Sequence, residues 1–140
     1  MLCDPSLKSR AVKLVMEVHG MQAETRRHFP ESLRARELEV SDDIAKMVGH
    51  LFKGQNDSQI VFWECDVEME VKPHSHNYDE YCLVVEGVCT EFIEGVKHVL
   101  RKGDEILIPA GKMHWASMTP PYRAIDYFGG NRFEYRNHKK

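Results

Sequence analysis

The sequence lacks the features that mark several classes of protein. It contains no run of about 18 apolar residues such as a membrane helix needs. Its opening stretch, MLCDPSLKSR, has no apolar core of a secretory signal. A net charge of −3 gives no reason to expect nucleic-acid binding. We therefore predict a cytoplasmic protein with neither a membrane nor a nucleic-acid partner.

Cysteines at paired spacings are absent from the sequence. The four cysteines, Cys3, Cys65, Cys82 and Cys89, form no CxxC pair. A reducing cytoplasm keeps such residues as thiols, so we expect no disulfide framework. A zinc site built on cysteines lacks its usual spacing. Cys82 lies in an apolar run, and we interpret it as a small buried residue in preference to a nucleophile.

The length of 140 residues suits a single core, and the pattern divides it at residue 36. Residues 1–36 form an expected N-terminal helical extension. Within it, Asp4 can cap a helix that Gly20 ends, and the apolar residues between them fall on one stripe. We expect this helix to pack on its own domain or on a second subunit.

In residues 37–140 the apolar side chains recur at every second position, which indicates strands. The stretch SQIVFWECDVEMEV, residues 58–71, alternates throughout and predicts one half-buried strand. Further short strands are indicated by the stretches KMVGHLFKG, YCLVVEG, VCTEFIEG, VKHVLRKGDEILIPAG, HWASMT and RAIDYFGG. Regular short strands with frequent turns are typical of an all-β sandwich or small barrel.

The stretch KPHSHNYDEYCLVVEG places two histidines and a glutamate beside an apolar strand. His74 and His76 share one face of an extended chain, roughly 7 Å apart. Neutral imidazoles together with the Glu80 carboxylate suit a divalent transition metal. A pair of histidines on an exposed strand face is the common alternative for so short a motif.

Two stretches together resemble the signature motifs of the cupin superfamily. The first runs His74, one residue, His76, three residues, Glu80, six residues, Gly. The second, GDEILIPAGKMH, runs Gly, five residues, Pro, one residue, Gly, two residues, His114. The resemblance implies an all-β, double-stranded β-helix (jelly-roll) barrel of six or more strands. It also implies one metal ion per chain, bound inside the barrel by His74, His76, Glu80 and His114.

The chain departs from the family pattern at two positions. Glu68 stands where a glycine often precedes the first motif, and Met118 stands where an asparagine commonly follows the second. Neither position supplies a ligand in the family. Met118 should make the pocket wall more apolar and polarizable.

The implied ligand set leaves room for chemistry. Three neutral imidazoles and one carboxylate leave two open positions on a six-coordinate ion, as a catalytic site requires. Such a set accepts Fe, Mn, Ni, Cu, Co or Zn, and affinity order alone does not choose among them. Pro109 to Lys112 is interpreted as a tight turn that directs His114 toward the other ligands.

Other polar residues are weaker candidates. Tyr78 and Asp79 lie between ligands, where a solvated turn is preferred over substrate contact. Of the neighbours Asp126 and Tyr127 only one can face inward, and a core tyrosine is the default. The arginines nearest by position to bind a carboxylate or phosphate are Arg123 and Arg132. The histidines that match no motif are His19, His28, His50, His98 and His138, and we expect surface or hydrogen-bonded roles for them.

Three functions fit this reading, since a fold does not fix an activity. We favour a small metalloenzyme of oxygenase, isomerase or decarboxylase type that acts on a small polar organic molecule. A non-enzymatic small-molecule sensor and a metal-stabilised structural barrel are the alternatives. A homodimer is also expected, because Tyr81, Leu83 and Val85 make the second face of an inward-facing strand apolar.

Overall fold

The computed structural model describes residues 31–136, and the helix expected between Asp4 and Gly20 lies outside that range. The elements are two short 3-10 helices, η1 (Glu31–Arg36) and η2 (Asp42–Ile44), and the strands β1 (Val48–Lys53), β2 (Gln59–Cys65), β3 (Met69–His74), β4 (Glu80–Ile93), β5 (Val96–Arg101), β6 (Glu105–Ile108) and β7 (His114–Phe128). No helix among the described residues is long and apolar enough to cross a membrane.

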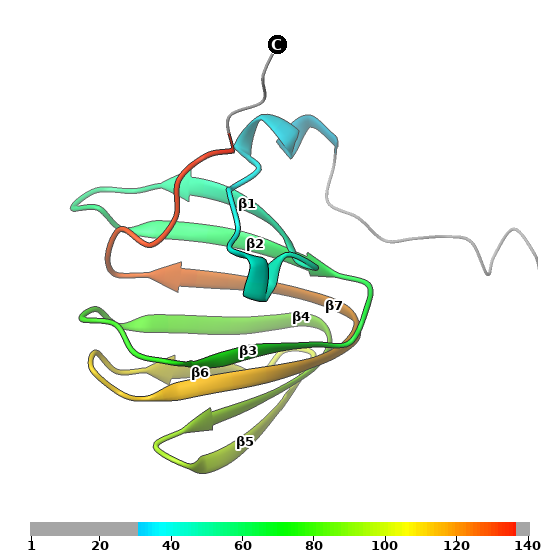
Figure 1. The fold of residues 1–140 in the computed structure, drawn as a ribbon, viewed down its shortest axis with the longest axis vertical. Helices are drawn as coiled ribbons and strands as arrows, with labels where there is room; N and C mark the ends of the chain where they lie inside the picture. The colour runs from blue at the N-terminus through cyan, green and yellow to red at the C-terminus, as the bar shows by residue number, and fades with distance from the viewer. Residues whose placement is uncertain (1–30, 137–140) are drawn as a thin grey trace, which may run out of the picture.

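The long strands β4 and β7 organise the barrel. They pair antiparallel along most of their length and lie side by side at the centre of Figure 1. The first half of β4 pairs with β6, and the adjoining second half of β7 pairs with β2 and, through it, β1. The second half of β4 pairs with β5, and the first half of β7 pairs with β3. Two sheets thus share their central strands, which confirms the all-β barrel predicted from the sequence.

Both long strands pass from one sheet to the other near Gly87. The pairing of β4 with β7 shifts register on either side of Glu86. Gly87 has φ 82°, and a Cβ there would collide with the carbonyl oxygen of Pro121 and lie 2.9 Å from that of Thr119. Only glycine fits so close an approach at positive φ. Gly87, the last residue of the first motif, is therefore required by the backbone geometry and is not a candidate ligand.

The interior is filled by side chains from both sheets. The least exposed apolar residues, at 2% or below, are Leu38, Leu51, Val61, Cys65, Val84, Cys89, Ile108, Ala124 and Phe128. The three described cysteines, Cys65, Cys82 and Cys89, are all buried and free. The segment before β1 closes one edge, because Leu38 bridges Tyr135 near the end of the described chain.

The single strand predicted over residues 58–71 is instead two strands. β2 ends at Cys65 and β3 begins at Met69, with Val67 46% exposed between them. The turn carries the chain from the sheet where β2 pairs with the second half of β7 to the sheet where β3 pairs with the first half. The alternation continues through the turn, so periodicity alone does not reveal it.

Candidate metal centre

Four residues that are separated along the chain converge at one end of the barrel interior. His74 ends β3, His76 lies in the following loop, Glu80 begins β4 and His114 begins β7. One nitrogen or oxygen of each residue lies within 4.8 Å of the corresponding atom of every other. The structure therefore brings together all four residues that the sequence singled out. Glu80 and His114 are buried, and His74 and His76 are half-buried.

Each imidazole is oriented by a backbone carbonyl near it in the sequence. Nδ1 of His74 lies 2.8 Å from the carbonyl oxygen of Lys72, and Nδ1 of His114 lies 2.9 Å from that of Lys112. Nδ1 of His76 lies 2.7 Å from the carbonyl oxygen of Tyr78. A carbonyl only accepts, so each Nδ1 carries the proton and leaves the Nε2 lone pair available. Such a partner behind each ring is what a metal-ligating histidine requires.

Two of the three Nε2 atoms, those of His76 and His114, lie against the Glu80 carboxylate. Nε2 of His76 lies 2.8 Å from Glu80 Oε2, and Nε2 of His114 lies 3.5 Å from the same oxygen without a hydrogen-bond partner. Burial would raise the pKa of Glu80, but the contacts with His114 and His76 outweigh it and lower that pKa to about 2. Lone pairs and an ionised carboxylate together need positive charge at their centre, either as added protons or as a metal ion.

The second motif forms the expected tight turn, and it is tied to the first motif. The N–H of Gly111, at φ 79°, donates to the carbonyl oxygen of His76 at 2.7 Å. The N–H of Ala110 donates to Asp79 Oδ1 at 2.8 Å. Asp79 is exposed, as expected of a turn residue, yet its carboxylate fixes this turn. Tyr78 stacks on the His76 ring, with centroids 4.4 Å apart and planes 7° apart.

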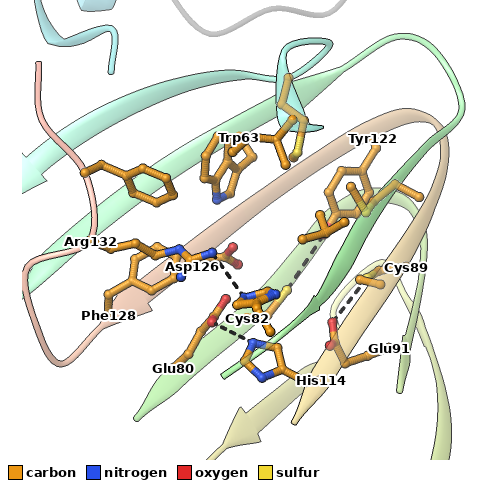
Figure 2. Close-up of a pocket in the computed structure, with 17 residues that line it drawn as sticks. Trp63, Glu80, Cys82, Cys89, Glu91, His114, Tyr122, Asp126, Phe128 and Arg132 are labelled. Carbon is orange, nitrogen blue, oxygen red and sulfur yellow. Dashed lines mark hydrogen bonds and ion pairs between the residues drawn. The ribbon is translucent and has the colours of Figure 1, made fainter. Parts of the chain in front are cut away.

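A cavity of about 70 Å³ lies beside the ligands. Trp63, Tyr122, Phe128 and Met118 supply apolar walls, with the last as the sequence predicted. Glu80, Glu91, Asp126 and Arg132 supply ionisable groups, and Figure 2 shows them around one interior space. Ligand sites commonly combine apolar walls with a few convergent polar groups in this way. The cavity and the histidine cluster form a single site.

Two carboxyl groups in the cavity were not singled out as site residues by the sequence. Oε1 of Glu91 and Oδ1 of Asp126 are buried without a hydrogen-bond partner. Burial, followed by the charge of Glu80, raises the pKa of Asp126 to about 8 and that of Glu91 to about 9. The prediction that Tyr127 is the inward-facing residue of this pair is wrong. Asp126 faces the cavity, while Tyr127 is 41% exposed.

The other polar residues that the sequence analysis considered have different surroundings in the structure. Arg132 lines the cavity, whereas Arg123 is directed to Asp66, with Nη2 2.9 Å from Oδ1. Cys82 is buried, as expected, 3.8 Å from the Tyr122 hydroxyl, and burial raises the pKa of its thiol. His50 is buried with Nδ1 3.2 Å from the carbonyl oxygen of Leu33, in the hydrogen-bonded role expected for it.

His98 is not part of the cluster. The three other histidines that match no motif, His19, His28 and His138, lie outside the described residues.

Comparisons with known proteins agree on the domain type. Residues 62–125 match the family model described as a cupin domain. KdgF from Halomonas sp. is similar in structure, with a TM-score of 0.60 and 24% identity over 81% of this chain and 97% of that one. An RmlC-like cupin from Shewanella frigidimarina has a TM-score of 0.60 and 21% identity, over 80% and 95%. No curated protein matches the chain.

A similar barrel also occurs within a larger protein. An HTH_3 family transcriptional regulator from Vibrio cholerae aligns with a TM-score of 0.55 and 20% identity, over 72% of this chain and 60% of that one. Similarity at this level of identity establishes the fold alone. The barrel, the convergent histidine cluster and the family match over residues 62–125 together support a small cupin-type domain in this chain.

Proposed function

We propose that this chain is a small metalloenzyme in which His74, His76, Glu80 and His114 hold one divalent transition metal. The observation that carries the proposal is the orientation of three imidazoles. Each has its Nδ1 proton engaged by a backbone carbonyl, which leaves the Nε2 lone pair free to bind a metal within the cluster. The ligand set suits Fe, Mn, Ni, Cu, Co or Zn.

The chemistry proposed is of oxygenase, isomerase or decarboxylase type, on a small polar organic molecule. A metal ion held there supplies a Lewis acid, or a centre that activates oxygen, beside the cavity. The apolar walls exclude bulk water, which strengthens charge interactions inside. Asp126 and Glu91, with raised pKa values, hold protons in the same cavity at neutral pH. A carboxyl that is protonated near neutrality is a candidate proton donor.

A binding or sensor role without turnover is the second candidate. It is favoured by the similarity of the barrel to part of a transcriptional regulator. In that role the cavity would hold its ligand unchanged. Incubating the metal-loaded protein with small polar acids and following their consumption by mass spectrometry separates the two, since a sensor binds such a molecule and returns it intact.

The metal assignment is tested by elemental analysis of protein purified without chelator. We expect close to one divalent transition metal per chain, and almost none in the variant His74→Ala/His76→Ala. The control variant is His98→Ala, which removes an imidazole outside the cluster and should keep the metal. Full metal content in the double variant would contradict the assignment.

We further propose that the cupin-type domain, residues 37–140, forms a homodimer through an outer apolar patch. We define this patch as Ile60, Tyr81, Leu83, Leu107 and Tyr127. These residues come from β2, β4, β6 and β7 and are each at least 37% exposed. Tyr81 pairs across the strands with both Leu107 and Tyr127, so the patch is continuous. A continuous apolar face on a sheet marks an interaction surface, and identical chains commonly meet through one two-fold contact.

A further inference from the structure

Arg132 places a single guanidinium at the metal-binding end of the cavity. Its Nη2 donates a hydrogen bond to Nε2 of His74 at 3.1 Å. Among residues 31–136 its guanidinium makes no ion pair with a carboxylate, and the rings of Phe128 and Phe133 lie 5.6 Å and 5.2 Å from it. Burial is the main cause that lowers the pKa of His74, and the charge of Arg132 adds to it.

The arginine is held in place by the first residue of β2, which pairs with the last residue of β7. Gln59, at 1% exposure, begins β2 and accepts hydrogen bonds from the backbone N–H groups of Arg132 and Phe133 at 2.9 Å and 3.0 Å. Its amide nitrogen donates to the side chain of Asn131 at 2.7 Å and to the carbonyl oxygen of Phe133 at 2.9 Å. The loop after β7 is thus fixed on both sides of Arg132. A guanidinium on so constrained a backbone is preorganised for a partner.

The hydrogen bond to His74 conflicts with metal binding at the same atom. Nδ1 of His74 is already engaged with the carbonyl oxygen of Lys72, so Nε2 has one lone pair. A metal ion that takes this lone pair leaves the guanidinium without an acceptor. A buried or half-buried donor that loses its partner is costly unless another acceptor replaces it. The new acceptor must lie beside the metal, where the open coordination positions are.

From this geometry we infer that the site takes small carboxylic acids, whose carboxylate binds the metal and is paired by Arg132. The inference rests on the proposed metal site and names its substrate class. A planar guanidinium pairs with a carboxylate through two parallel hydrogen bonds, which gives both charge and orientation. An oxygen next to the carboxylate, as in a 2-hydroxy or 2-oxo acid, would fill the second open position. The cavity, at about 70 Å³, has room for roughly five to seven water-sized groups.

The test compares lactate with lactamide, which has the same shape without the negative charge. Both are titrated into manganese-loaded protein by calorimetry, with Trp63 fluorescence as a second readout because that ring lines the cavity. We expect lactate to bind at least about tenfold more tightly than lactamide, as a charge-assisted pair implies. Arg132→Met should abolish this preference with manganese content unchanged. Arg132→Lys should retain part of the preference, since lysine keeps the positive charge but cannot donate two parallel hydrogen bonds from a planar group.

The matched control is Arg101→Met, which removes an exposed arginine from β5 that does not line the cavity. This variant should keep the full preference for lactate. Equal binding of lactate and lactamide to manganese-loaded wild-type protein, or binding of neither at millimolar concentration, overturns the inference while the metal site stands. A preference that survives in Arg132→Met also overturns it. A chain that takes up no metal overturns the proposed function itself, and the substrate class falls with it.

Discussion

The N–H of Gly111 donates to the carbonyl oxygen of His76 at 2.7 Å, and this bond joins the two motifs. His114 follows three residues later, so one turn sets the approach of both imidazoles. The bond from Ala110 to Asp79 Oδ1 closes the same turn from its other side. Backbone geometry therefore holds these candidate ligands toward one another without a cation.

Asp79→Ala should weaken metal binding without unfolding the protein. Asp79 is exposed and contributes no ligand, but it fixes the turn that leads to His114. Loss of such supporting contacts typically costs about 10- to 100-fold in metal affinity. Competition with a fluorescent chelator measures the change. The control is Asp104→Ala, because Asp104 is an exposed turn residue that also accepts a backbone N–H, that of Arg101, far from the ligands. Equal losses in both variants would contradict the argument.

Metal affinity should fall steeply below about pH 6. Imidazole has an ordinary pKa of about 6.5 and must lose its Nε2 proton to bind a metal. Burial lowers the pKa of His74, so this ring resists protonation in the metal-free protein. Glu80, with a pKa of about 2, stays ionised throughout and adds nothing to the dependence. Calorimetric titrations between about pH 8 and about pH 5 measure the effect. A flat profile would indicate ligands other than histidine.

Glu91 should make the metal-free protein less stable as pH rises. Its pKa is raised to about 9 in the fold, from an ordinary value of 4.5, so the native state keeps a proton that the unfolded chain releases between those values. The free energy of unfolding therefore falls with rising pH across that window, by up to about 1.4 kcal/mol per pH unit. Below it, both states are protonated and the group has no effect.

The variant Glu91→Gln removes this dependence. In chelator-treated protein it should match the wild type near about pH 4.5 and exceed it by several kcal/mol near about pH 9, as measured by urea unfolding. Glu70→Gln serves as the control, because Glu70 is exposed on β3. Parallel profiles for the wild type and Glu91→Gln would show that the buried carboxyl ionises without penalty.

Leu83→Arg should convert the proposed dimer to a monomer or to insoluble protein. The substitution puts a charge in the outer apolar patch, where a partner chain would bury it unpaired. Light scattering at micromolar concentration should give about twice 16.3 kDa for the wild type and a lower mass for the variant. Val99→Arg is the control, since Val99 is 45% exposed on β5, outside the patch. A monomeric wild type would contradict the proposal.

The motif residues were predictable because their spacing is local and specific. His74, His76 and Glu80 fall within seven residues of one another, and His114 follows a recognisable turn. The facing of β4 was predictable from alternation, which places Cys82 inside and Leu83 outside. These predictions need only the strand period and the turn chemistry, which the sequence carries directly.

The residues that were missed depend on contacts between distant segments. Hydrophobicity favoured Tyr127 as the inward residue, but its ring lies outside, 6.4 Å from that of Tyr81, and Asp126 takes the interior. Arg132 lies beyond the last strand and is directed by Gln59, which only the folded barrel brings near. Strand alternation gives two possible facings, and the choice between them is made by packing across strands.

The candidate ligands come from opposite walls of the barrel. Glu80 pairs with Ile108 and Phe128 in one sheet, whereas His74 and His114 pair with each other in the other. A cation bound between them would thus be a cross-link that unfolding must break. Free metal at about 100 times its dissociation constant would add about 2.7 kcal/mol to the free energy of unfolding. The melting temperature of this protein would then rise with the concentration of free metal.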